Sequence, residues 1–224
     1  MDAAAAIAVV VTYLVSSVSA PWLIARLNGV DLRTAGSRKL GGSNLMKTVG
    51  VVPGVIGGVI DGAKGFFAVF VAGSLGLPVD VQLACGVAAV VGQSWPIFHR
   101  FDGGRANATG WGFAIAADPV AALIMFIPIL AAITGTLIAR PRPTRLIPIA
   151  SLLSFGVFAA VIWEQEGTKP AVVAGLALLA IVILRRVTAG LREDLAIGAP
   201  LVRVVLNRAL FDRSELQERG LVPL

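Results

Sequence analysis

Two charged residues, Asp61 and Lys64, stand in the otherwise apolar segment GVIDGAKGFFAVF. A separation of three residues places both side chains on one face of a helix. Charges inside a membrane span are costly and usually mark a site of function, so we take this pair as a candidate site. A pair that only fixes helix packing is the alternative. Gly62 and Gly65 beside the pair allow a second helix or a substrate to approach closely.

A glycine-rich basic segment precedes the pair: GSRKLGGSN at residues 36–44, with Lys47 soon after. Glycines allow backbone amides to approach an anion, and Arg38, Lys39 and Lys47 supply positive charge for a phosphate. Taken alone, the segment is equally typical of a flexible basic loop.

A third polar stretch, GQSWPIFHRFDGGRANAT, covers residues 92–109. A double glycine followed by Arg105, Asn107 and Thr109 at the start of a predicted helix indicates an anion site, because free backbone amides and the helix dipole both favour a phosphate there. His99 is the only histidine of the chain. A lone histidine in such a position is more often a surface or interfacial side chain than a catalyst.

The composition of the chain indicates that these polar stretches are positioned by membrane helices. Of 224 residues, 57% are hydrophobic and 14% charged, and the mean hydropathy is +0.86, which contradicts a soluble protein. In a membrane protein the net charge of +6 indicates basic cytoplasmic loops, and we expect no nucleic-acid partner. The single cysteine, Cys85, lies in an apolar run and is interpreted as a buried small hydrophobe.

Apolar spans are predicted at residues 3–25, 54–76, 81–97, 122–139, 147–163 and 170–187, and residues 108–121 are ambiguous. If residues 110–139 cross once, ten of the nineteen Lys and Arg residues fall outside. If a short helix breaks near Asp118-Pro119 and reverses the chain, only Lys169 of the nineteen falls outside. The positive-inside rule therefore favours an all-α bundle of seven transmembrane helices, with the fourth short or broken, the N-terminus outside and the C-terminus cytoplasmic. Residues 26–53, 98–109 and 140–146 are then cytoplasmic.

Beyond about residue 190 the sequence becomes polar. We divide the chain into a membrane domain, residues 1–190, and a basic cytoplasmic tail, residues 191–224. Within the tail, residues 200–211 have the spacing of an interfacial amphipathic helix, and a solvated basic tail is the alternative.

Taken together and in this order, the three polar stretches resemble the PlsY family, the integral membrane acyl-phosphate:glycerol-3-phosphate acyltransferases of bacteria. The family patterns GSGNxGATN, DxxKG and GHxFPxxxxFKGGKGVAT stand here as GSRKLGGSN, DGAKG and GQSWPIFHRFDGGRANAT. TRLIPIASLL at 144–153 and ILRRVTAG at 183–190 are similar to two later family segments, so the resemblance reaches from residue 1 to about 190.

The resemblance implies seven membrane helices and transfer of a fatty acyl group from acyl phosphate to glycerol 3-phosphate. The products would be lysophosphatidic acid and phosphate, formed for phospholipid biosynthesis at the bacterial inner membrane. No cofactor and no metal is expected, membrane lipids are the expected surroundings, and the oligomeric state stays open. Matched position by position, the family motifs imply catalytic roles for Ser37, Lys64, Gln93 and Arg105. They imply binding of substrate or phosphate by Gly41, Ser43, Asn44, Lys47, Asp61, Gly103, Gly104, Thr109 and Arg145. We add Arg38 and Lys39 for their positive charge and Asn107 for its place at the predicted helix start.

Three departures from the family pattern bear on the chemistry. Gln93 replaces a histidine, so the side chain there can donate hydrogen bonds but cannot take a proton. Asp102 replaces a lysine, a change of two charge units that would repel a nearby phosphate. Arg38 and Lys39 replace Gly-Asn and would restore positive charge from the opposite loop. These departures keep a second hypothesis open, a non-catalytic or repurposed paralogue that binds anionic lipids or partners a lipid enzyme, and a transporter is a third.

Overall fold

The structure is a computed structural model that describes residues 2–139, 146–165 and 169–218. All regular structure in these ranges is helical, as predicted. The helices are α1 (Ala3–Ser16), α2 (Ala20–Leu27), α3 (Gly42–Thr48), α4 (Val51–Ser74), α5 (Val79–Ser94), the 3₁₀ helix η1 (Ile97–His99), α6 (Asn107–Ala117), α7 (Pro119–Met125), α8 (Ile127–Ala139), α9 (Leu146–Glu164), α10 (Lys169–Thr188), α11 (Leu191–Ala196), α12 (Leu201–Phe211) and α13 (Glu215–Glu218).

Six helical segments in the described ranges are long and apolar enough to cross a membrane: Ala3–Leu27, Val51–Ser74, Val79–His99, Pro119–Ile138, Leu146–Glu164 and Lys169–Ala196. Their outward faces carry large apolar side chains, such as Val59, Leu123 and Leu137, each more than half exposed. Such a surface is stable in lipid and not in water. The prediction of an all-α integral membrane protein is confirmed.

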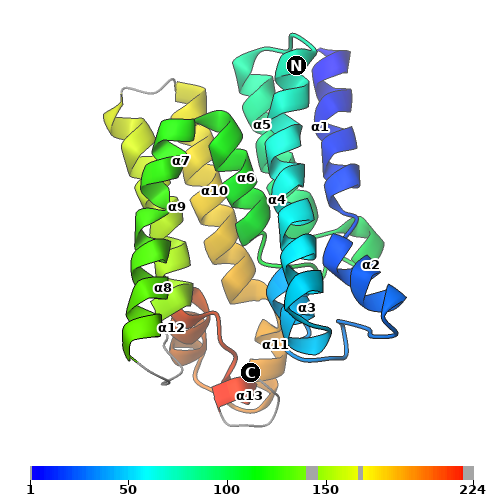
Figure 1. The fold of residues 1–224 in the computed structure, drawn as a ribbon, viewed down its shortest axis with the longest axis vertical. Helices are drawn as coiled ribbons and strands as arrows, with labels where there is room; N and C mark the ends of the chain where they lie inside the picture. Colours follow the sequence, from blue (N-terminus) through cyan, green and yellow to red (C-terminus); the bar gives the residue numbers. More distant parts are fainter. Residues whose placement is uncertain (1, 140–145, 166–168, 219–224) are drawn as a thin grey trace.

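Helix α6 is the short element that the sequence placed before Asp118-Pro119. It has 11 residues, which rise about 16 Å, roughly half the hydrocarbon thickness. Asp118 then caps α7 by accepting a hydrogen bond from the Ala121 amide at 2.8 Å, and Pro119 occupies the first turn. Figure 1 shows α6 and α7 running in opposite directions. The break is therefore where it was predicted, whereas a total of seven crossings stays a prediction.

Close contact between α4 and α6 depends on glycine. A Cβ atom at Gly65 would overlap the carbonyl oxygen of Thr109, and one at Gly112 would overlap the carbonyl oxygen of Gly62. Backbone carbonyls cannot move aside as a flexible side chain can. The two helices therefore touch through their backbones, and this contact brings the Asp61 face of α4 to the N-terminal end of α6.

The largest apolar core surrounds α6. It joins Phe113 to Phe155 and Phe158 of α9 and to Leu178 of α10, all fully buried. Cys85 lies in a smaller buried cluster with Ala5, which agrees with its interpretation as a small hydrophobe.

The three polar stretches lie toward the same end of the bundle as the C-terminal helices, and the N-terminus lies at the opposite end (Figure 1). A helix was predicted within residues 200–211, and the structure has α12 there, from Leu201 to Phe211 after an extended Pro200. It lies against α9 and α10 and buries Val204 and Arg208, while Leu201 and Val202 are exposed. Contact of that exposed face with a membrane interface stays a prediction.

Candidate active site

Asn44 holds the first polar loop in shape. Its side chain is fully buried; its amide nitrogen donates to the carbonyl oxygens of Ala35 and Lys39 at 3.1 and 3.0 Å, and its Oδ1 accepts from the Ser37 amide at 2.8 Å. Gly36 is required here because its φ is +55° and a Cβ atom would overlap Asn44 Oδ1. Asn44 was predicted to bind substrate, but the structure uses its side chain to fix the loop that presents Ser37 and Lys39.

The double glycine is expected to help bind phosphate, and this stays a prediction, although both of its amides have acceptors within the protein. The Gly103 amide donates to the Ser94 carbonyl at 3.3 Å and the Gly104 amide to the Gln93 carbonyl at 3.1 Å. A Cβ atom at Gly103 would also overlap the Gln93 carbonyl, and one at Gly104 would lie 2.7 Å from the Leu40 carbonyl oxygen. The glycines are therefore needed for close contact between loops. The helix start just beyond them remains available, because α6 has no capping side chain.

Asp61, Lys64 and Gln93 form a closed ring of hydrogen bonds. Lys64 Nζ donates to Asp61 Oδ1 at 2.8 Å and to Gln93 Oε1 at 2.9 Å, and Gln93 Nε2 donates to Asp61 Oδ2 at 2.8 Å. Lys64 Nζ also donates to the Val18 carbonyl oxygen. Gln93 thus occupies the histidine position of the family pattern as a bridge between a cation and an anion.

Lys64 is placed differently from its prediction as a catalytic cation. Asp61 and Gln93 line the large cavity described below, whereas Lys64 lies behind them against Val18 and is not part of the lining. Its three acceptors belong to the protein, and its side chain is 11% exposed. In this arrangement Lys64 fixes the positions of Asp61 and Gln93, and a catalytic role for Lys64 stays a prediction.

Two cavities meet at Ser37, Lys39 and Arg105, the three residues that line both. The larger has a volume of about 1210 Å³. Its wall includes Val55, Val59, Phe67 and Ile115, all at least 40% exposed on the outward faces of α4 and α6. The larger cavity is therefore apolar where it reaches the lipid-facing surface.

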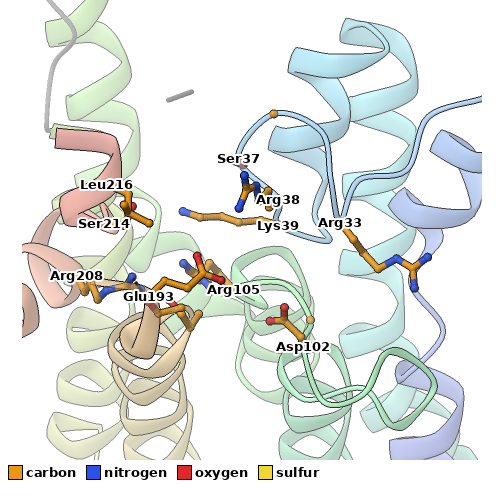
Figure 2. Close-up of a pocket in the computed structure, with 14 residues that line it drawn as sticks. Arg33, Ser37, Arg38, Lys39, Asp102, Arg105, Glu193, Arg208, Ser214 and Leu216 are labelled. Carbon is orange, nitrogen blue, oxygen red and sulfur yellow. Dashed lines mark hydrogen bonds between the residues drawn. The ribbon is translucent and has the colours of Figure 1, made fainter. Parts of the chain in front are cut away.

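The smaller cavity, of about 200 Å³, is polar and is shown in Figure 2. Besides the shared residues it is lined by the cationic side chains of Arg33, Arg38 and Arg208, with Asp102 and Glu193 among them. We call the place where the two cavities meet, defined by Ser37, Lys39 and Arg105, the junction.

Asp212, from the tail, pairs with both cations of the junction. Its Oδ2 accepts from Lys39 Nζ at 2.8 Å and its Oδ1 from Arg105 Nε at 2.6 Å. Burial and the neighbouring Arg105 lower the pKa of Lys39, Asp212 opposes both, and the resulting pKa is about 8. For Asp212 burial raises the pKa, but Arg105 and Lys39 together outweigh it, and the pKa of this carboxyl falls well below its usual value.

Asp102 is compensated by an arginine from α10. Arg185 Nη2 donates to Asp102 Oδ1 at 2.6 Å and to the Gly103 carbonyl at 2.7 Å, and Arg185 Nε donates to the Gly104 carbonyl at 3.0 Å. The Asp102 side chain is 77% exposed. The charge change at position 102 therefore forms a solvent-facing ion pair that holds the glycine loop.

Arg186 and Ser151 are cavity residues that the sequence interpretation did not name as site residues. Arg186 Nη2 donates to Ser151 Oγ at 2.6 Å, and Asn107 Nδ2 donates to the same hydroxyl at 3.2 Å. Arg186 Nε and Asn107 Oδ1 are buried and have no hydrogen-bond partner among the described residues. The segments ILRRVTAG and TRLIPIASLL carried the signal for these residues, because they contain the arginine and the serine.

The remaining predicted residues are placed as follows. Gly41, Ser43, Lys47 and Thr109 line the larger cavity, and Arg145 lies outside the described residues. His99 lines neither cavity. Its ring stands edge-on against Trp22, with centroids 4.9 Å apart, which agrees with an interfacial side chain.

Comparison with known proteins gives one consistent result. The family model for glycerol-3-phosphate acyltransferase matches residues 6–193. The chain is 33% identical over 204 residues to glycerol-3-phosphate acyltransferase 4 of Dehalococcoides mccartyi, covering 90% of this chain and 85% of that protein. It is 34% identical over 174 residues to glycerol-3-phosphate acyltransferase 1 of Moorella thermoacetica, covering 77% and 85%.

Solved structures agree with the sequence comparisons. The glycerol 3-phosphate form of PlsY, an integral membrane glycerol 3-phosphate acyltransferase, superposes with a TM-score of 0.73 at 26% identity, covering 97% of this chain and 98% of that one. The lysophosphatidic acid form of PlsY gives a TM-score of 0.70, covering 87% and 93%. With its all-helical membrane fold and its two cavities that meet at a cationic junction, the chain belongs to the glycerol-3-phosphate acyltransferase family.

Proposed function

We propose that the protein transfers a fatty acyl group from acyl phosphate to glycerol 3-phosphate at the junction. One observation carries the proposal: an apolar cavity that reaches the lipid-facing surface and a polar cavity lined by arginines share Ser37, Lys39 and Arg105. An acyl phosphate needs an apolar space for its chain and cations for its phosphate, and glycerol 3-phosphate needs a polar, cationic space.

In this arrangement the acyl chain lies in the larger cavity, with its phosphate at Lys39 and Arg105. Glycerol 3-phosphate enters from the smaller cavity, where Arg33 and Arg38 supply positive charge. Its 1-hydroxyl oxygen forms a bond to the acyl carbonyl carbon as the bond from that carbon to the phosphate oxygen breaks. The hydroxyl proton passes to an oxygen of the departing phosphate, so the products are lysophosphatidic acid and inorganic phosphate.

Much of the rate comes from holding the two substrates together and from stabilising the charge that develops on the leaving phosphate. Ser37 lines both cavities and is a hydroxyl donor close to both substrates. Because the leaving phosphate takes the proton, this route uses no side chain as a base. It therefore tolerates Gln93 in place of a histidine.

The second hypothesis, a non-catalytic paralogue, rested on Gln93 and Asp102. Gln93 is held in the ring with Asp61 and Lys64, and the exposed Asp102 carboxylate pairs with Arg185. Neither substitution removes a cation from the junction, which favours the enzyme. We also propose the bacterial inner membrane as its location, with the junction on the cytoplasmic side, because only Lys169 of the nineteen basic residues then lies outside.

The test is acyl transfer by the purified full chain, with glycerol 3-phosphate as acceptor and acyl phosphate, acyl-coenzyme A or acylated carrier protein as donor. We expect equal amounts of lysophosphatidic acid and inorganic phosphate from acyl phosphate and little product from the thioesters. Arg105→Gln should lower the rate at least about a hundredfold, since a charged hydrogen bond in a catalytic site is worth ~2.7 kcal/mol or more. The control Arg192→Gln removes an exposed tail arginine that lines neither cavity. Transfer from a thioester with none from acyl phosphate would refute the proposed donor.

A further inference from the structure

The tail beyond α10 brings an anion to the place where the proposed function needs a phosphate. Asp212 lies directly after α12 with φ of +50°, a left-handed conformation that aspartate tolerates better than most residues. Its two carboxylate oxygens accept separately from Arg105 at 2.6 Å and from Lys39 at 2.8 Å, and its main-chain carbonyl accepts from Lys39 at 3.1 Å.

The tail is built to hold Asp212 there. Arg208 Nε, with its side chain 4% exposed, donates to the fully buried Asp194 at 2.7 Å, and the same guanidinium donates to the carbonyl oxygens of Ala189 and Gly190 at the end of α10. The Leu216 amide on the far side of Asp212 donates to Asp194 at 3.3 Å.

A second set of contacts closes the segment around Asp212. The buried Glu215 accepts a hydrogen bond from Asn207 at 2.8 Å and forms an ion pair with Arg203 at 3.2 Å. Arg186 donates to the Ala209 carbonyl at 3.2 Å. Residues on both sides of Asp212 are therefore anchored. In Figure 2 the Lys39 side chain extends across the smaller cavity toward Ser214 and Leu216 of the tail.

A carboxylate and a phosphate bind the same donors. Each presents oxygen acceptors with negative charge, and each forms charge-assisted hydrogen bonds with a guanidinium or an ammonium. The Asp212 carboxylate and a phosphate cannot occupy the junction together. A phosphate within hydrogen-bond distance of Lys39 and Arg105 would lie beside the carboxylate that is bound to the same two cations. Like charges at such separation repel strongly at a partly buried site.

We propose that Asp212 is an internal anion that occupies the phosphate position at the junction, and that a substrate phosphate binds by displacing it. The proposal rests on the proposed function, which places the phosphate of acyl phosphate at Lys39 and Arg105. The apparent association constant for phosphate is then the intrinsic association constant multiplied by the fraction of molecules in which Asp212 has left the junction. Asp212 sets substrate affinity and keeps the two buried cations paired between turnovers.

The test is binding of inorganic phosphate to the purified full chain, compared between the parent and Asp212→Asn, by equilibrium dialysis in detergent. Asparagine keeps the shape of the side chain and tolerates the left-handed conformation, but it loses the charge. We expect phosphate to bind at least about fivefold more tightly, equivalent to ~1 kcal/mol. Asp212→Gly, which also accepts φ of +50°, should act in the same direction and provides the measurement if the asparagine variant does not fold.

The matched control is Glu164→Gln. It removes one negative charge at an exposed position at the end of α9 that lines neither cavity. We expect it to change phosphate affinity less than about twofold, as a distant screened charge does. Equal or weaker phosphate binding by both Asp212 variants would overturn the proposal, and so would an equal gain in the Glu164 control.

Turnover separates this proposal from the proposed function. In Asp212→Asn the KM for acyl phosphate should fall several-fold while kcat stays within about twofold of the parent, because a competitor has been removed. A lower kcat with unchanged KM would show that Asp212 positions Lys39 and Arg105 instead, and would overturn the displacement. Tighter phosphate binding in a protein that does not acylate glycerol 3-phosphate would refute the proposed function alone.

Discussion

Removing Lys64 alone should damage the protein much more than removing Lys64 and Asp61 together. Asp61 is 3% exposed and accepts from Lys64 and Gln93 at 2.8 Å each. Loss of one partner from a buried ion pair costs about 3–5 kcal/mol, because the other charge stays buried without compensation. At about 2–4 °C per kcal/mol for a chain of this size, Lys64→Met should lower the thermal midpoint by roughly 6–20 °C.

The double variant Asp61→Asn/Lys64→Met removes both charges and keeps the volumes. Replacing a buried pair by uncharged groups is often close to neutral, so we expect its thermal midpoint within a few degrees of the parent. Because Lys64 lies behind the cavity lining, we also expect the double variant to retain acyl transfer within about tenfold, or ~1.4 kcal/mol, of the parent.

Both quantities are measured on the same detergent-purified samples, the midpoint by thermal unfolding and the rate by lysophosphatidic acid formed from acyl phosphate. The control is Asp61→Asn alone, which leaves Lys64 with the Gln93 and Val18 oxygens as acceptors and should fall between the parent and Lys64→Met in stability. A double variant that unfolds like the parent but has lost activity a thousandfold or more would refute this reasoning. Lys64 would then contact the reacting groups.

Three further predictions follow from the fold, the junction and the α4–α6 contact. If the positive-inside topology is correct, a maleimide applied to intact cells should label Gln165→Cys and not Thr34→Cys, and the reverse pattern would contradict it. The pKa of Lys39 is about 8, so its charge is lost as the pH rises through that value. Phosphate affinity should therefore weaken above pH 8. In Lys39→Arg the charge is kept, and this weakening should be absent. Gly65→Ala should lower the thermal midpoint, because its Cβ overlaps the α6 backbone, and the cost in stability should be about 1–3 kcal/mol. The control Gly156→Ala, with nothing within 4 Å of the added Cβ, should leave the midpoint unchanged.

Features set by local sequence were predictable. The Asp118-Pro119 break, the pairing of Asp61 with Lys64 and the helix that begins just after Pro200 each depend on neighbouring residues, and each is present in the structure. Composition alone was sufficient for the membrane class. Most of the site residues expected from the sequence line one of the two cavities.

Features set by contacts between distant segments were not predictable. The double glycine has the pattern of an anion loop, but its amides are satisfied by Gln93 and Ser94, and only the fold shows this. Arg185 compensates Asp102 across 83 residues of chain. Asp212 lies in a tail with no motif, and it reaches Lys39 only because α12 lies against the ends of α9 and α10.

The most direct test of the junction is an experimental structure of the full chain with a hydrolysis-resistant acyl phosphonate. We predict that the chain of this analogue lies in the larger cavity beside Phe67. Its phosphonate should lie within hydrogen-bond distance of Lys39 and Arg105, with Asp212 displaced from both. A phosphonate bound elsewhere, with Asp212 still paired to the two cations, would contradict the account.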